Sequence, residues 1–203
     1  MNRSFWHGLA VAGLVSMTAS LAFAQSPQLQ VVRGTVEKID GPTLVVKARN
    51  GTDVTIRLAD NWTATALVKA SLGDVKEGSF VGAAAMPQPD GTQKAIEVHI
   101  FPEWLKASQG HTPFDLQPNS TMTNAIVDQT VTSVDGQVLT VKYPGGEKKI
   151  IVSPNTPVVA FDKGDRAEVK DGTKVIVRAT KQPDGSLTAA SVTYGRDGLT
   201  PPM

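Results

Sequence analysis

The chain has 203 residues, with 20 Lys and Arg against 19 Asp and Glu, three His and no Cys. A formal charge of +1 gives no electrostatic reason to expect nucleic acid or an anionic membrane surface as the partner. The absence of cysteine excludes disulfides, thiol chemistry, cysteine-bound zinc, iron–sulfur clusters and a lipid-anchored cysteine. The length suits one large domain or two small ones.

The first 24 residues have the order of a secretory signal peptide. Arg3 supplies a positive start, residues 9–21 are mostly apolar, and Ala22-Phe23-Ala24 fits a cleavage site. The apolar run is shorter than the roughly 20 residues that cross a bilayer. We therefore expect a mature chain that begins at Gln25, lies in the bacterial periplasm or is secreted, and has no membrane span. Without Arg3 it carries 19 basic and 19 acidic residues.

The rest of the chain repeats itself at a spacing of 94–95 residues. Ile39-Asp40-Gly41 matches Val134-Asp135-Gly136, and Gln88-Pro89-Asp90-Gly91 recurs as Gln182-Pro183-Asp184-Gly185. The agreement extends over about seventy residues and includes glycines and apolar positions. This period is too long for a solenoid, so it predicts the duplication of a domain.

Both copies alternate apolar and polar residues between Asp-Gly, Asn-Gly or Gly-Gly pairs, a pattern that predicts strands joined by hairpins. The strands expected in the first copy are residues 31–39, 43–49, 54–58, 79–86 and 93–101. Those expected in the second are residues 125–134, 137–143, 149–152, 173–181 and 187–194. Residues 59–74 and 153–168 are expected to be longer connections, with a short helical turn at 64–72.

Five short strands in a meander suit a small closed barrel, because closure removes exposed strand edges. We therefore predict an all-β protein with two tandem five-stranded OB-like β-barrels, at residues 31–101 and 125–194. A small β-sandwich is the competing architecture. Residues 195–203 are expected to form a C-terminal tail.

Residues 102–124 are predicted to connect the barrels as a turn-rich strap that contains Pro, Gly and aromatic residues. Trp104 and Phe114 are expected to pack where the barrels meet, because aromatic side chains usually serve burial.

The motif Gly-Thr-Val-x-x-Ile-Asp-Gly-x-x-Leu-x-Val-Lys at residues 34–47 is followed by Asn-Gly-x-x-Val-x-Ile at 50–56 and Leu-Gly-Asp-Val-Lys-Glu-Gly at 72–78. This order resembles a family of exported bacterial β-barrel domains of unknown function that often occur in tandem. The second copy matches less closely, since Gln129 stands where Gly34 begins the motif. The resemblance implies OB-like barrels and no assigned activity. Similar chains are sometimes labelled metal-transport permeases, and the permease part does not fit a chain without membrane spans.

His99 and His111 are the histidines that follow the predicted signal peptide. With Asp115 and Glu103 they provide imidazole nitrogen and carboxylate oxygen, which can hold Zn²⁺ or Cu²⁺. Their spacing follows no established ligand pattern, so the alternative is a packed connector in which the histidines fill polar positions.

The sequence has no nucleophile elbow, zinc-protease helix, phosphate-binding loop or dinucleotide fingerprint. We therefore expect no catalytic residues and no required cofactor. The preferred hypothesis is a non-enzymatic binding or scaffold protein that recognises an envelope protein or a glycan through its barrel loops. A metal-binding accessory protein is the alternative, and a hydrolase is a third possibility, because a fold does not determine a function.

Overall fold

The computed structural model describes residues 28–105, 107–133 and 136–203, so the predicted signal peptide lies outside the described residues. The described chain is all-β, with twelve strands and three short 3₁₀ helices. None of the helices within these ranges has the length and apolar character needed to cross a membrane.

The elements follow one another along the chain with short connections. The first-half strands are β1 (Gln28–Asp40), β2 (Thr43–Ala48), β3 (Asp53–Lys69), β4 (Phe80–Pro87), β5 (Gln93–Phe101) and β6 (Gly110–Pro113). The second-half strands are β7 (Thr121–Ser133), β8 (Gly136–Tyr143), β9 (Gly146–Val152), β10 (Val158–Lys163), β11 (Lys174–Lys181) and β12 (Leu187–Gly195). The 3₁₀ helices are η1 (Leu72–Asp74), η2 (Arg166–Glu168) and η3 (Arg196–Gly198).

All ten predicted strands are present, but the predicted connections differ from the structure. The expected helical turn at residues 64–72 is wrong for most of its length, because β3 continues to Lys69 and only η1 is helical. The far end of β3 stays extended because it pairs with strands on both edges, parallel to β12 and antiparallel to β10. Strand β10 lies in the second expected connection, and β6 lies in the strap.

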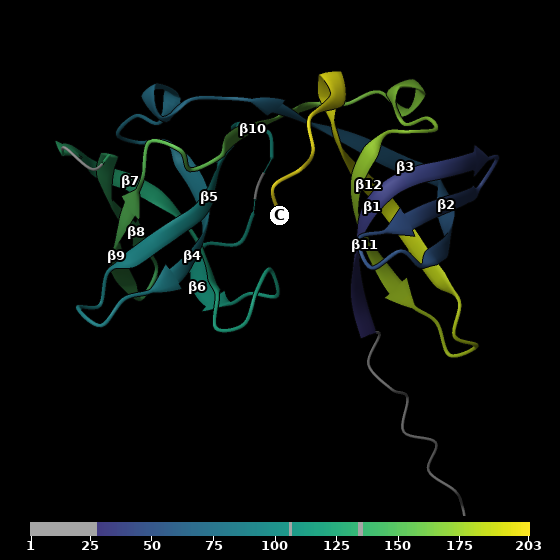
Figure 1. Cartoon of the computed structure of the whole chain (residues 1–203), viewed down its shortest axis with the longest axis horizontal. Helices are drawn as coiled ribbons and strands as arrows, with labels where there is room; N and C mark the ends of the chain where they lie inside the picture. Colours follow the sequence, from purple (N-terminus) through teal and green to yellow (C-terminus); the bar gives the residue numbers. More distant parts are fainter. Residues whose placement is uncertain (1–27, 106, 134–135) are drawn as a thin grey trace, which may run out of the picture.

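The strands close into two five-stranded barrels, named ring 1 and ring 2, which form the two lobes of Figure 1. Ring 1 has the order β1–β2–β3–β12–β11 and closes through β11 and β1. Ring 2 has the order β7–β8–β9–β5–β4 and closes through β4 and β7. In each ring one pair is parallel, β3–β12 in ring 1 and β5–β9 in ring 2.

This pairing differs from the expectation that residues 31–101 and 125–194 each close on themselves. Ring 1 takes β1, β2 and β3 from the first half of the chain and β11 and β12 from the second, and ring 2 takes β7, β8 and β9 from the second half and β4 and β5 from the first. The physical reason lies in β3, which at 17 residues spans roughly 55 Å when extended. The chain therefore leaves ring 1 along β3 and starts β4 in ring 2.

Strand β10 joins the rings, because it pairs with β3 on one edge and with β5 on the other (Figure 1). Each ring encloses its own apolar core. The core of ring 1 includes Val36, Leu44, Ile56, Trp62 and Tyr194. The core of ring 2 includes Val81, Val98, Val127, Leu139 and Ile150.

Candidate functional site

A third apolar cluster lies between the two ring cores and draws on several elements. Its buried members are Leu67 of β3, Val159 of β10, Ile176 of β11, and Met203. Phe114, Phe161 and Leu199 are among the half-buried side chains packed against it. The rings are therefore held together by apolar burial as well as by strand pairing.

Residues 199–203 are part of this junction. The Arg49 guanidinium donates hydrogen bonds through Nη2 to the main-chain oxygens of Pro201, at 2.9 Å, and Met203, at 3.1 Å. The Met203 side chain is 6% exposed. Gly195 permits the approach of this segment, because a Cβ at that position would overlap the main-chain oxygen of Leu199.

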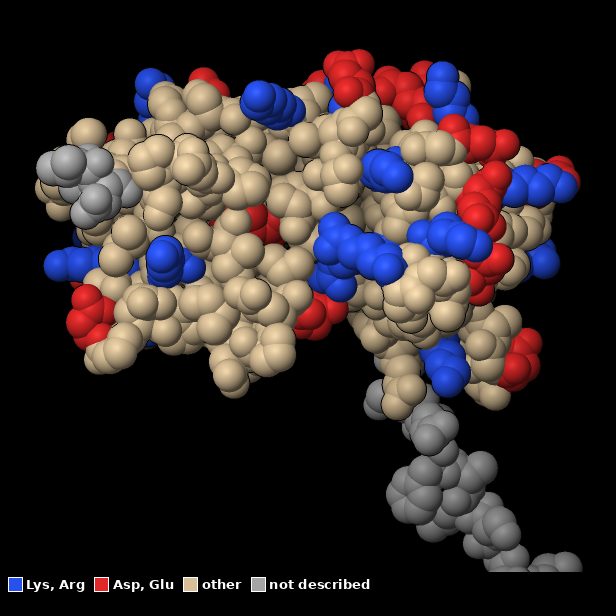
Figure 2. All heavy atoms as spheres, viewed as in Figure 1, with Lys and Arg blue, Asp and Glu red and all other residues tan. Residues whose placement is uncertain are grey.

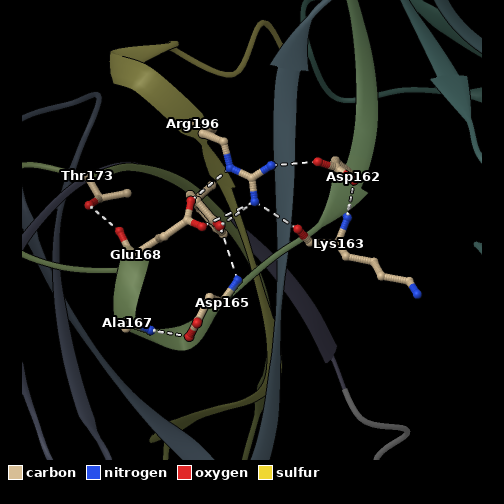
Figure 3. Close-up of polar contacts among 8 residues, drawn as sticks. Asp162, Lys163, Asp165, Ala167, Glu168, Thr173 and Arg196 are labelled. Atoms are coloured by element: carbon tan, nitrogen blue, oxygen red, sulfur yellow. Dashed lines mark hydrogen bonds and ion pairs between the residues drawn. The ribbon is translucent and has the colours of Figure 1, made fainter.

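A network around Arg196 fixes the start of this segment (Figure 3). The Arg196 guanidinium contacts Glu168 through Nε at 2.9 Å and Asp162 through Nη1 at 2.6 Å, and Nη2 donates to the Lys163 main-chain oxygen at 2.8 Å. The hydrogen bonds from Arg196 hold the pKa of Glu168 below its usual range. Burial raises the pKa of the Tyr194 hydroxyl, which lies against the same groups. These contacts tie η3 to β10 and η2.

A groove of about 870 Å³ opens at the junction beside residues 199–202. Its lining combines segments of both rings and of the bridge between them. The lining residues are Arg49, residues 69–72, Ile96, residues 154–159 and residues 199–202. Arg49 and Lys69 supply the charge of this lining, and Figure 2 shows basic side chains gathered near the middle of the molecule, where the lobes meet.

The strap contacts ring 1 through two neighbouring residues. Asp115 accepts hydrogen bonds from both terminal nitrogens of Arg33, at 2.8 and 2.9 Å, and these bonds lower the pKa of the Asp115 carboxyl. Phe114 packs, partly buried, against the cluster between the rings. Trp104 differs from the expectation, because it is 46% exposed.

The outer surface of ring 2 carries an uncommon set of buried polar side chains. Glu97 and His99 flank Val98 on β5, and because Val98 faces the ring core, they point to the outer side. Glu97 is 0% exposed and His99 is 1% exposed. Strand β4 lies next to them, and β7 follows, with Asn124 in register with Gly82 and Gly82 in register with His99.

Three phenylalanines form a ladder beside this set. The ladder consists of Phe80 on β4, Phe101 on β5 and Phe161 on β10. Adjacent phenyl groups stack with their centroids 4.9 Å apart. Phe161 and Phe101 also meet the His99 ring edge to face, at 5.6 and 6.4 Å between centroids. These contacts fix the orientation of the imidazole.

The predicted metal ligands do not come together. His99 lies on β5, whereas His111 lies on β6. Strands β4 and β7 lie between them, so the two backbones are three strand spacings, or roughly 14 Å, apart. His111 Nδ1 lies 2.8 Å from the Thr123 hydroxyl, and burial lowers the pKa of His111, with a further contribution from Lys148. Glu103 is exposed. In the described part of the chain, no group of three or more His, Asp or Glu side chains is placed to hold a metal ion.

The residues that sequence reasoning missed are Glu97, Asn124 and Arg49. The alternation Glu97-Val98-His99 on a predicted strand places both polar side chains on one face, and this signal was available in the sequence. Nothing in the sequence connects Asn124 or Arg49 to a site, because strand register and the path of residues 199–203 bring them there.

Comparison with known proteins gives one match. Residues 130–193 match the model of a family described as a domain of unknown function, DUF5666. The match begins near the end of β7 and ends within β12, so its strands are shared between the two rings. No curated protein matches the chain, and no solved structure matches it.

Proposed function

We propose that this chain is an exported, non-enzymatic binding or scaffold protein of the bacterial periplasm or envelope, with a protein or glycan partner that binds in the groove between the rings. The groove of about 870 Å³ is the observation that carries this proposal. Its volume lies in the usual range of ligand pockets, roughly 300–1,000 Å³. Arg49 and Lys69 favour a partner that offers carbonyl, carboxylate or other electron-rich oxygen atoms.

The proposal includes the origin of the fold, two OB-like domains derived from one by duplication. The identical strand order of the rings and the repeated Gln-Pro-Asp-Gly turn support this origin. In such a pair the junction is a surface that a single domain lacks, which makes it a suitable place for a new binding function.

Site-specific photo-cross-linking in cells tests the proposal. A photoreactive amino acid at Asn155, in the groove lining, is expected to give a discrete product of higher mass. The same amino acid at Asp184, in the exposed turn between β11 and β12, serves as the matched control and is expected to give none. No product from position 155, or the same products from both positions, contradicts binding in the groove.

A further inference from the structure

The outer surface of β5, β4 and β7 in ring 2 brings metal-ligating side chains around a floor of small residues. The floor is Gly82 and Ala84 of β4. Register places Gly82 between His99 and Asn124, and Ala84 between Glu97 and Met122. We call these four side chains, Glu97, His99, Met122 and Asn124, the polar face. None of the four belongs to the three apolar clusters of the molecule's described residues.

Several polar atoms of this face lack the hydrogen bonds that burial demands. Both carboxylate oxygens of Glu97, Nε2 of His99 and Oδ1 of Asn124 are buried and have no aligned hydrogen-bond partner among the described residues. Burying polar and charged groups without a partner costs free energy, and nearly all such groups in native proteins have one. A species bound at the polar face would satisfy these atoms.

The separation of Glu97 and His99 fits two ligands of one ion. His99 Nε2 lies 3.1 Å from Glu97 Oε1, close enough for an ion pair, but the geometry does not meet the angular requirement of a hydrogen bond. Nitrogen and oxygen ligands lie about 2.0–2.2 Å from Zn²⁺. If the ligand–metal–ligand angle is roughly 90° or slightly more, two such ligand atoms are about 3 Å apart. His99 Nε2 and Glu97 Oε1 have this separation.

A third ligand already lies over the floor. The backbones of His99 and Asn124 are two strand spacings apart, about 10 Å, with only Gly82 between them. A Cβ on Gly82 would lie 2.7 Å from Asn124 Oδ1 and 2.9 Å from Phe101 Cε2, so the amide oxygen extends over Gly82 beside the edge of the Phe101 ring. The amide nitrogen of Asn124 donates to the Ser108 main-chain oxygen at 3.2 Å, which leaves Oδ1 to face the site.

We propose that the polar face binds one transition-metal ion, Zn²⁺ or Cu²⁺, through Glu97 Oε1, His99 Nε2 and Asn124 Oδ1. Imidazole with carboxylate and amide oxygen suits these borderline divalent ions. The thioether of Met122 lies on the same face and adds a soft ligand for copper. This set shares only His99 with the ligands expected from the sequence. It contains one His and one Glu, and the remaining ligands are the amide of Asn124 and the thioether of Met122, so it is not a group of three His, Asp or Glu side chains.

Metal titration of tag-free protein tests the proposal, with isothermal calorimetry for Zn²⁺ and Cu²⁺ and with Mg²⁺ as the hard-ion control. One equivalent of Zn²⁺ or Cu²⁺ is expected to bind. His99→Gln should weaken binding by more than the roughly 100-fold that loss of an outer-sphere partner costs. His111→Gln, which changes the histidine bound to Thr123, is the matched control and should leave the affinity within about twofold of the original.

A spectroscopic measurement on the unaltered chain keeps the test independent of whether His99→Gln folds. The electron paramagnetic resonance spectrum of the Cu²⁺ form should show coupling to a single imidazole nitrogen, and Asn124→Asp should raise the affinity by adding a negative charge. Three results overturn the proposal: less than one equivalent of metal, weak binding of several ions that neither histidine variant changes, or loss of binding in His111→Gln alone. None of them affects the cross-link at Asn155, so the two proposals fail separately.

Discussion

The two rings share one order of strands but turn different surfaces toward their junction. In ring 2 the small residue Gly82 lies in register between His99 and Asn124. At the matching register position of ring 1, Ile176 lies between Thr193 and Arg33. Ile176 is part of the apolar cluster between the rings, whereas Gly82 leaves space for Asn124 Oδ1 and the edge of the Phe101 ring. The same framework thus supports packing in one ring and a polar site in the other.

The third strand is the second difference between the rings. In ring 1, β3 is continuous over 17 residues. In ring 2, the corresponding stretch is divided into β9 and β10 by residues 153–157, which include Pro154 and Pro157. Proline has no N–H to donate to a strand ladder, so this break is local in origin. After this break β10 pairs with β5 of ring 2 on one edge and with β3 on the other, and residues 154–157 form part of the groove.

The largest expected effect comes from separating the halves that the rings share. Residues 25–105 contain no β11 or β12 to close ring 1, and residues 106–203 contain no β4 or β5 to close ring 2. We expect neither fragment to show cooperative unfolding alone, and we expect the two together to form a 1:1 complex. Circular dichroism and size-exclusion chromatography check this. A folded monomeric barrel from either fragment alone would show that closure across the halves is dispensable.

An intermediate effect is expected from changing the side-chain size at the matched positions, Ile176 in ring 1 and Gly82 in ring 2. Ile176→Ala should lower the free energy of unfolding by about 2–5 kcal/mol, because it opens a cavity between the rings. Gly82→Ala should cost about 1–3 kcal/mol, because its Cβ would lie 2.7 Å from Asn124 Oδ1 and 2.9 Å from Phe101 Cε2.

Urea unfolding measures both values. Ala84, on the same face as Gly82, supplies the control variant Ala84→Gly, which introduces no overlap. If Gly82→Ala proved neutral while Ile176→Ala was costly, Gly82 would not be needed for space, and the difference between the two surfaces would lose its steric basis.

The smallest expected effect concerns the ion pair that joins the strap to ring 1. Arg33 lowers the pKa of Asp115, so the pair stabilises the fold above the unfolded-state pKa of about 3.9, and this contribution is lost as the pH falls through the lower folded-state value. Asp115 is 53% exposed at its side chain, so Asp115→Asn should cost less than about 1 kcal/mol at pH 7.

Thermal or urea unfolding of both proteins from pH 7 to pH 2 checks the sign. The difference between them should shrink as the solution becomes acidic. A difference that grows on acidification runs against the assignment of Asp115 as the charged partner of Arg33.

The sequence predicted local structure well because hairpin turns depend on few residues. Gly91 and Gly185, in the repeated Gln-Pro-Asp-Gly turns, have φ values of +84° and +85°, which glycine adopts without strain. The strands beside them are where the alternation placed them. Sequence patterning did not reveal which strands share a ring, because a half-buried strand has the same alternation whichever partner it pairs with.

The candidate site was predicted only in part for the same reason. His99 was singled out, but its expected partners His111, Asp115 and Glu103 were chosen by closeness in the sequence. The structure instead pairs His99 with Glu97 on its own strand, and register places Asn124 of β7 two strands away on the same side of the sheet. Register between distant strands depends on the whole sheet, so a single sequence carries little signal for it.

Closure across the halves also sets an order of events during synthesis. Ring 2 needs residues up to Val152, and ring 1 needs residues up to Gly195. Strands β1, β2 and β3 are made first yet wait longest for their neighbours, with open edges that invite pairing with other chains. Contacts such as the bond from Val36 N to Thr173 O span most of the chain, and contacts so distant in sequence slow folding. The nascent protein therefore stays incompletely folded until nearly its last strand has been made.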